Sequence, residues 1–311
     1  MTTALYSHPD CLNHVNPARH PERVDRLRAI MAALEAPEFA ALERREAPLA
    51  DLAEVLRCHP QRHIDTIRAA LPETGQVALD GDTFVSAGSL TAALRAVGAM
   101  TAAVDAVMAD EVANAFCAIR PPGHHAETET PMGFCLFGTV AIAAKRALDH
   151  HGLNRVAIMD FDVHHGNGTQ DLLWNEPRVL FASTHQMPLY PGSGAATEVG
   201  ATGNILNCPL PPGTDGAGFR RVMDRDILPA LDAFSPELVL ISAGFDAHRA
   251  DPLANLAFEA ADFAWATERL CDIAALHAGG RVVSTLEGGY DLAALAESTA
   301  AHVAILMEQG G

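Results

Sequence analysis

Five short apolar runs, each followed directly by polar and ionisable residues, are the feature that most limits how this chain can fold. The runs are ANAFCAI (113–119), RVAIMDF (155–161), RVLFAS (178–183), ELVLISA (237–243) and RVVSTL (281–286). Most of them lack the alternation of apolar and polar residues that marks a half-exposed strand. We therefore expect strands that are buried on both faces of a parallel sheet.

Longer Ala- and Leu-rich segments of helical period separate these runs. They span 86–109, 137–151, 217–233, 257–279 and 291–308. Alternating strands and helices predict an α/β fold with a central, mainly parallel sheet and helices on both faces. The chain shows no repeat, low-complexity tract or linker, so we expect one domain over residues 1–311.

The polar segments that follow the runs carry the chemistry. They are RPPGHHAE (120–127), DFDVHHGNG (160–168), STHQ (183–186), AGFDAHRADP (243–252) and EGGYD (287–291). Ligands of open α/β sheets bind beyond the carboxyl ends of the strands, where these segments would meet. The sequence therefore predicts one polar pocket at this edge of the sheet.

A metal site is the first prediction for this pocket. Asp162 and His164 offer a carboxylate and an imidazole from one strand end, and Asp246 is the best-placed third ligand. Two oxygens and one nitrogen leave an open position for water, which is the pattern of a catalytic zinc site. An isolated Asp-x-His is more often a salt bridge, and Asp246 is what favours the metal.

Histidine and tyrosine side chains supply the rest of the expected chemistry. His124 and His125 are candidates for proton transfer near neutral pH, and Asp160 for orienting one of these rings. Tyr290 follows two glycines, and a phenol there is a good donor to a developing oxyanion. Taken alone, a His-His turn and a buried Tyr are common structural features.

Composition narrows the class of partner. The chain has 311 residues, 21 basic and 39 acidic, for a net charge of −18, and no Lys/Arg cluster. We therefore expect no nucleic-acid partner. Cationic substrates would suit this charge, although a plain acidic cytosolic protein would carry it too.

The six cysteines form no CxxC pair, which fits a reducing compartment. MTTALYSHPD does not resemble a signal peptide, and we see no run of about 18 apolar residues. We expect a cytoplasmic protein that is not membrane-bound.

The motifs RPPGHHAE, GFCLF, DFDVHHGNGTQ, SAGFDAHRADPL and EGGYD, with HPERVDRLRAI at 20–30, resemble the histone deacetylase superfamily. The residues of these motifs most resemble those of the class II enzymes and their bacterial relatives, which include acetylpolyamine amidohydrolases. The resemblance implies the arginase–deacetylase fold and a zinc ion held by Asp162, His164 and Asp246. It also implies that His124 and His125 are tandem catalytic histidines, with Asp160 behind His124 and Asn167 behind His125 to orient the rings. Tyr290 would be the phenol that stabilises the oxyanion.

The same resemblance implies further binding residues. The substrate channel and its rim would be formed by Gly133, Phe134, Tyr190, Asp82 and Leu253. Arg23 would lie beside an internal exit path. A structural potassium ion would be bound by Asp160, Asp162, His164, Ser183 and Thr184.

The implied activity is zinc-dependent hydrolysis of an acetyl or short acyl amide on the ε-amine of lysine. His125 would take the proton of the attacking water, Tyr290 would stabilise the oxyanion, and a histidine would protonate the amine. Gly166 stands where the two-manganese arginase branch has a bridging Asp, which disfavours ureohydrolase chemistry.

Acetylated polyamines remain an alternative substrate. One polyamine-selective group carries Glu where this chain has Leu253, but Glu127 and Glu129 keep this reading open. A non-catalytic acyl-lysine reader is disfavoured because every matched catalytic position is intact. Iron in place of zinc and a homo-oligomeric state are also left open.

Overall fold

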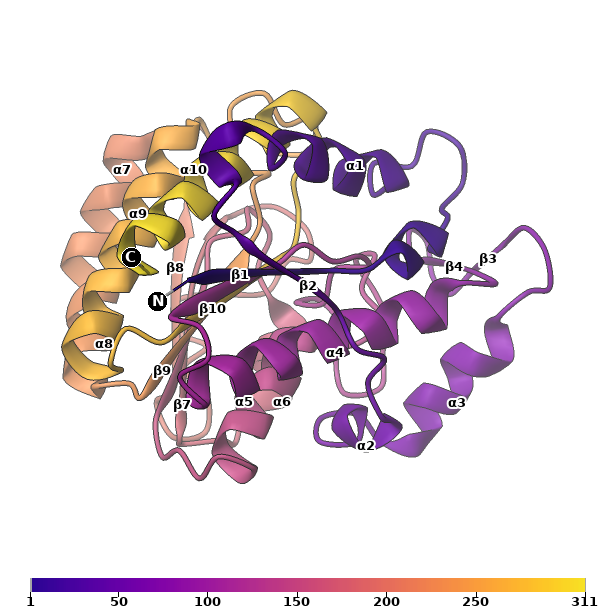
Figure 1. The fold of residues 1–311 in the computed structure, drawn as a ribbon, viewed down its shortest axis with the longest axis horizontal. Helices are drawn as coiled ribbons and strands as arrows, with labels where there is room; N and C mark the ends of the chain where they lie inside the picture. Colours follow the sequence, from indigo (N-terminus) through magenta and orange to yellow (C-terminus); the bar gives the residue numbers. More distant parts are fainter. Residues whose placement is uncertain (1, 311) are drawn as a thin grey trace.

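The computed structural model describes residues 2–310, and within them a single large sheet organises the chain (Figure 1). Its strands are all parallel and lie in the order β2-β1-β5-β10-β9-β6-β7-β8. Their bounds are β1 (Thr3–Ser7), β2 (Glu43–Glu46), β5 (Asn114–Cys117), β6 (Val156–Asp160), β7 (Val179–Gln186), β8 (Ile205–Leu210), β9 (Leu238–Ala243) and β10 (Val282–Leu286). The five predicted strands are the five central neighbours, and every residue in them is buried.

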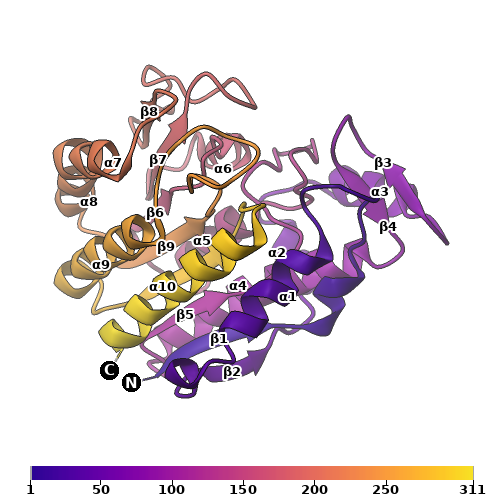
Figure 2. The same ribbon diagram turned by 90° about the horizontal axis from the view of Figure 1, so that it is seen from above.

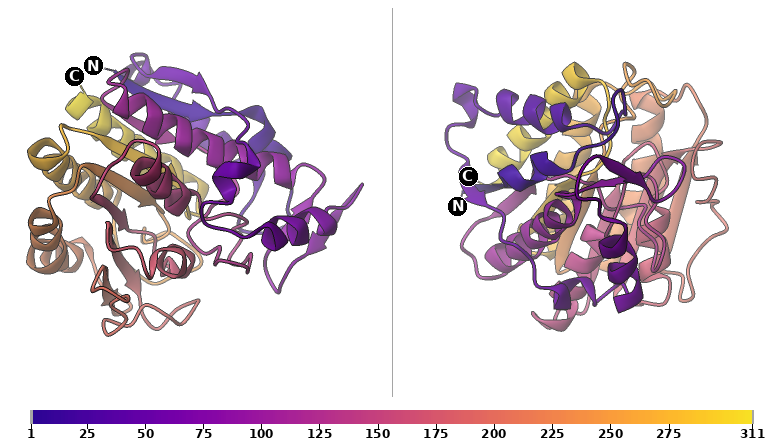
Figure 3. Two further views of the ribbon diagram at one scale, coloured as in Figure 1. Left: turned by 90° about the horizontal axis from the view of Figure 1, so that it is seen from below. Right: turned by 90° about the vertical axis from the view of Figure 1, so that its right-hand side faces the viewer.

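Helices cover both faces of the sheet, which confirms the predicted α/β fold (Figures 1 and 2). One layer contains α1 (Val24–Ala33), α7 (Gly216–Val222), α8 (Leu228–Phe234), α9 (Ala260–His277) and α10 (Leu292–Gly310). The other contains α2 (Leu52–Val55), α4 (Ser89–Met108), α5 (Thr139–Asp149) and α6 (Asn167–Leu173), with α4 and α5 in front in the left view of Figure 3. The described residues also form 3₁₀ turns at η1 (Pro9–Asn13) and η2 (Pro37–Phe39) and a π turn at η3 (Met223–Ile227).

A smaller unit beside the sheet was not predicted. It contains α3 (Gln61–Ala70) and an antiparallel hairpin of β3 (Gln76–Ala78) and β4 (Phe84–Ser86). Ile64, Ile67 and Val85 join a second, smaller apolar core there. The hairpin strands are only three residues long, and the residues of β3 lie at the surface, so neither strand forms an apolar run that could be recognised in the sequence. Their connection carries Asp82.

Helix α4 corrects the expectation that no segment is apolar enough to cross a membrane. This helix is long and apolar enough to cross a membrane, but 72% of its most apolar 18-residue stretch is buried inside the molecule. It packs against α5, β5 and β10. Its apolar character is therefore that of a core helix.

The segment predicted as one helix over 217–233 is interrupted. It forms α7, a π turn at η3 and then α8. Pro229 lies in the first turn of α8, and a proline has no N–H to continue the preceding ladder of hydrogen bonds. The spacing of the backbone hydrogen bonds therefore changes from that of an α-helix to that of a π turn at η3.

Candidate active site

The ends of the central strands bring the polar segments into one place. Asp160, the last residue of β6, lies opposite Ser183 of β7 on one side and Ser242 of β9 on the other. The turn after β10 reaches the segment after β5, where Glu287 Oε2 accepts a hydrogen bond from Gly123 N at 2.7 Å. Residues more than 160 positions apart in the chain therefore share one site.

Asp162, His164 and Asp246 lie side by side and are buried. His164 Nδ1 is 3.2 Å from Asp162 Oδ1 and 3.1 Å from Asp246 Oδ2. One donor atom from each residue lies within 4.8 Å of the other two. Backbone N–H groups fix both carboxylates: Val163 N donates to Asp246 Oδ1 at 2.8 Å, and Gly288 N donates to Asp162 Oδ2 at 2.7 Å.

This donor set fits a zinc ion. Ligand atoms at about 2.0–2.1 Å from a tetrahedral Zn²⁺ lie about 3.3 Å from one another, close to the two distances from His164. Two buried carboxylates also require a nearby positive charge. Burial alone would lower the pKa of His164, but Asp162 and Asp246 raise it to about 10, so without a metal the imidazole carries that charge. A divalent metal would replace this proton.

The tandem histidines are each held by a different partner. His124 Nδ1 lies 3.0 Å from Asp160 Oδ2, and His125 Nδ1 lies 2.7 Å from Asn167 Oδ1. Asn167 Nδ2 donates to Glu127 Oε1 at 2.7 Å, which turns its carbonyl oxygen toward His125. His125 Nδ1–H is therefore the donor, and its Nε2 lone pair is left for the cavity.

The two rings also differ in charge. Burial would lower the pKa of His124, but Asp162, Asp160 and Glu287 together hold it well above the usual value. Burial, with the neighbouring charges of His124 and His164, holds the pKa of His125 well below its usual value. A protonated and a neutral imidazole therefore stand next to each other, with ring centroids 4.0 Å apart.

Tyr290 closes the same site from the turn after β10. Its side chain is buried, its ring centroid lies 5.8 Å from that of Phe134, and its backbone N–H donates to Asp251 Oδ2 at 2.7 Å. Burial first, and then Asp246, raise the pKa of the phenol well above its usual value. The hydroxyl therefore keeps its proton and can donate it in a hydrogen bond.

The expectation for Arg23 is wrong, and Arg26 takes the inner position. Arg23 directly precedes α1, and its half-exposed side chain lies 3.9 Å from Asp25. Arg26 is fully buried in the first turn of α1, with its guanidinium 4.9 Å from the Tyr290 ring centroid. It donates to the carbonyl oxygens of Gly289 at 2.6 Å and Glu287 at 2.5 Å.

The turn EGGYD organises more of the site than its sequence indicated. Glu287 is fully buried and accepts hydrogen bonds from Gly123 N, His124 N and Ser242 Oγ. Gly288 has no room for a side chain, because a methyl group there would overlap the carboxylates of Asp162 and Asp246. The sequence drew attention to Tyr290 and missed Glu287, although its place in the same motif was the available signal.

A cavity of about 370 Å³ leads to these groups. It is lined by His20, Pro21, Gly81, Asp82, Phe84, His125, Gly133, Phe134, His164, Leu189, Tyr190, Leu253 and Tyr290. All five residues expected in the substrate channel and rim are among them. His20 was not expected, and its Nε2 lies 2.9 Å from the carbonyl oxygen of Asp82, so it supports the loop that carries this carboxylate.

The residues expected at a potassium site also lie together. Asp160 and Ser183 are paired across β6 and β7, and Asp162 N donates to Asp160 Oδ1 at 3.1 Å. Ser183 Oγ lies 2.9 Å from His185 Nδ1. The buried hydroxyl of Thr184 has no hydrogen-bond partner within residues 2–310.

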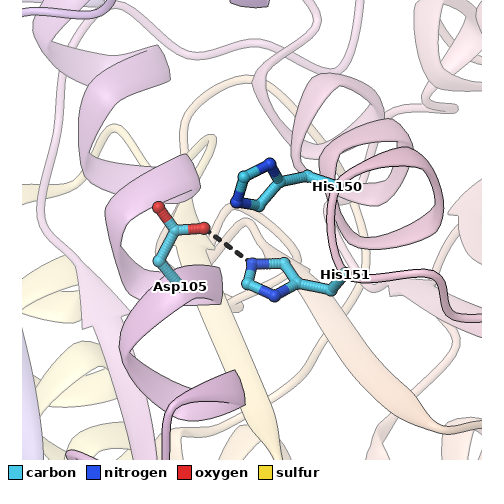
Figure 4. A group of neighbouring side chains, drawn as sticks. All are labelled: Asp105, His150 and His151. Atoms are coloured by element: carbon cyan, nitrogen blue, oxygen red, sulfur yellow. Dashed lines mark hydrogen bonds and ion pairs between the residues drawn. The ribbon is translucent and has the colours of Figure 1, made fainter.

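A second His/Asp group lies apart from this site (Figure 4). His150 and His151, which follow α5, turn their rings toward Asp105 of α4, and His151 Nε2 is 2.8 Å from Asp105 Oδ1. Arg146 already donates to both carboxylate oxygens of Asp105, at 2.7 Å each. The group therefore forms an ion-pair link between two helices and is a poor candidate for a metal site.

A buried Asp–His–Asp group, two adjacent histidines and a phenol at the end of one cavity form the arrangement of a metal-dependent hydrolase. The sequence-family model of the histone deacetylase domain matches residues 20–306 of this chain. The chain therefore belongs to the histone deacetylase family.

Individual relatives agree with this assignment. The chain is 40% identical over 301 residues to a probable deacetylase of Archaeoglobus fulgidus, covering 94% of this chain and 82% of the relative. It is 39% identical over 278 residues to the histone deacetylase-like amidohydrolase of Pseudomonas aeruginosa, covering 88% and 73%. The crystal structure of the HDA15 HD domain superposes with a TM-score of 0.93 at 34% identity, covering 99% of this chain and 89% of that one. The protein is thus an enzyme of the deacetylase or amidohydrolase type.

Proposed function

We propose that this enzyme is a zinc-dependent deacetylase that removes acetyl or short acyl groups from the ε-amine of lysine in peptides or proteins. The observation that carries the proposal is the cavity, which joins an apolar, aromatic rim to His125, His164 and Tyr290 at its inner end. Residues 1–311 would form one catalytic domain, acting in the cytoplasm. Acetylated small amines are the rival substrates.

The charges at the rim favour lysine over polyamines. A polyamine carries further ammonium groups, which need carboxylates when they leave water. Asp82 is the one acidic residue among the thirteen that line the cavity. Glu127 is bonded to Asn167, and Glu129 is paired with Arg62, so neither of these acids is free for a substrate cation. The aromatic rings of Phe134 and Tyr190 instead suit the methylene stem of lysine.

In this proposal Asp162, His164 and Asp246 hold zinc, which when bound polarises the substrate carbonyl and lowers the pKa of water. His125 accepts the proton of the attacking water at Nε2. Tyr290 donates its hydroxyl hydrogen to the oxygen on which negative charge develops. The histidine pair returns a proton to the departing amine. Potassium near Asp160, Ser183 and Thr184 belongs to the proposal as well.

The experiment that tests the proposal compares hydrolysis of an acetyl-lysine peptide, N-acetylputrescine and N-acetylspermidine by the zinc-loaded protein. We expect the highest kcat/KM for the peptide. A higher value for either polyamine would assign the enzyme to small-molecule deacetylation. No turnover of any of the three would contradict the proposed acyl group.

Replacing Asn167 with Asp, in a chain that also carries Glu127→Gln so that no carboxylate faces the new one, is expected to move the acid limb of the pH profile of kcat/KM to higher pH, by about one unit. A carboxylate beside His125 Nδ1 stabilises the imidazolium and so raises the pKa of His125. The base must be neutral to act, so activity is lost earlier as the pH falls. Asn154→Asp, at an exposed position, adds the same charge elsewhere and should leave the limb in place. An unchanged limb in Asn167→Asp would exclude His125 as the base.

A further inference from the structure

The loop at 187–199, which is the first part of the connection between β7 and β8, carries Tyr190 into the cavity. The Tyr190 ring meets the His125 ring edge-on, with centroids 5.2 Å apart. Tyr190 itself is 38% exposed, and the neighbouring Leu189 packs against the main apolar core. The exposed ring therefore depends on contacts elsewhere in the loop as well for its position.

Two buried histidines contact the loop three and four residues after Tyr190. His165 Nδ1 lies 2.8 Å from Ser193 Oγ, and His185 Nε2 lies 2.9 Å from the carbonyl oxygen of Gly194. The two rings are adjacent, with centroids 4.8 Å apart. His165 follows the expected metal ligand His164 directly, and the sequence had left its role open.

The hydrogen bonds define how each ring is protonated. Gln170 Nε2 donates to Glu198 Oε2 at 2.6 Å, so Gln170 presents Oε1 to His165 Nε2 at 3.2 Å. His165 Nε2–H therefore donates, and its Nδ1 accepts the Ser193 hydroxyl. His185 Nε2–H donates to a carbonyl in the same way. Each ring thus has both nitrogens in hydrogen bonds, His165 with Ser193 and Gln170, and His185 with Ser183 and Gly194.

Gly194 lies directly against both rings. Its φ is +89°, and a Cβ atom there would lie 2.5 Å from His185 Nε2 and 2.6 Å from His165 Cγ. Glu198 holds the same stretch from the other side, since it accepts hydrogen bonds from Gly194 N and Ala195 N at 3.1 and 3.0 Å. The loop is thus fixed at 193–195.

We infer that His165 and His185 are positioning residues for the substrate channel, which hold Ser193 and Gly194 and thereby place Tyr190 beside His125. This inference rests on the proposed function for its effect on substrate, but the contacts themselves do not. His185 is the next-to-last residue of β7, and His165 lies five residues beyond the end of the adjacent strand β6, so they join the substrate loop to the segment that carries His164. Their role is in substrate binding and not in the chemical step.

Hydrogen–deuterium exchange of the full chain tests the structural part. We expect Ser193→Ala and His165→Asn to increase deuterium uptake in peptides covering 187–199 and to leave the central strands unchanged. Ser193 is distant in sequence from the metal ligands, so its variant keeps the test valid if His165→Asn disturbs metal content. Thr197→Ala removes an exposed hydroxyl of the same loop and is the control, which should show no change. Unchanged uptake in Ser193→Ala and His165→Asn would overturn the inference.

Steady-state kinetics test the functional part. Loss of one hydrogen bond of about 1 kcal/mol predicts a KM about fivefold higher for Ser193→Ala, with kcat within about twofold of the wild type. Adding Ser193→Ala to Tyr190→Ala should raise KM no further, because both changes act through the same ring. Full additivity, or a fall in kcat alone, would contradict the assignment. If the wild type hydrolyses no acylated amine, the proposed function fails, and the exchange result still decides whether the histidines position the loop.

Discussion

Phenylalanine in place of Tyr290 is expected to lower kcat by about 100- to 1,000-fold, the range found when one oxyanion donor is removed. The phenol is buried and keeps its proton, because burial and Asp246 raise its pKa well above the usual value. In the proposed mechanism it contributes a hydrogen bond that matters only when negative charge develops on the substrate oxygen. KM, zinc content and the affinity for a hydroxamate should therefore stay close to those of the wild type.

The matched control for this variant is Tyr190→Phe, which removes a phenolic hydroxyl from the same cavity. Tyr190 stands at the rim with its ring against His125, so the expected change in kcat is less than about threefold. Equal losses in the two variants would mean that the cavity is disturbed as a whole. Wild-type kcat in Tyr290→Phe would exclude the phenol as the oxyanion donor.

Loss of an outer-shell partner weakens metal binding by up to about 100-fold, and an expected direct ligand such as Asp246 should contribute more. Replacement of Asp246 by Asn is therefore expected to weaken zinc binding by at least about 100-fold. The amide keeps the size of the side chain and can still accept the hydrogen bond from Val163 N, but it removes one of the two negative charges of the expected ligand set. The purified variant should contain less zinc than the wild type, as measured by elemental analysis. Hydrolysis should fall with zinc content and recover in part at high zinc concentration.

The second His/Asp group provides the control for this experiment. Asp105→Asn changes the same side chain in a group that also contains two histidines, but Arg146 occupies both carboxylate oxygens. We expect no change in zinc stoichiometry or in kcat for this variant. Zinc loss from Asp105→Asn, with zinc retained in Asp246→Asn, would reverse our assignment of the metal site.

The sequence was informative for the five central strands of the sheet, which appear as continuous apolar runs and were each predicted. Strand β1 was missed although four of its five residues are buried, because TALYS is short and has a polar residue at each end. The edge strands β2 and β8 have no apolar run, because the edge of a sheet is chemically mixed. Strand β2 reads ERRE and pairs only with β1, while β8 contains Pro209, which edge strands tolerate. These strands could not be distinguished from loops by pattern.

The candidate site also contains residues that could be predicted from the sequence and residues that could not. Its ionisable side chains follow apolar runs, so the expected ligands and the tandem histidines could be selected from sequence. The residues that were missed act through backbone atoms or through contacts distant in sequence. Arg26 binds carbonyl oxygens of the turn after β10, and Glu127 reaches His125 only through Asn167. No spacing in the chain encodes such contacts, because the fold alone brings the partners together.

The separation between the EGGYD turn and the rim has a consequence for how such enzymes diversify. In the proposed mechanism Glu287, Gly288 and Tyr290 each contact or supply a different part of the reaction site, so few substitutions in this turn should preserve turnover. Asp82 and Tyr190, by contrast, belong to loops attached to other strands. Substitutions in those loops can redirect the enzyme toward new acylated amines while the reaction chemistry is inherited unchanged.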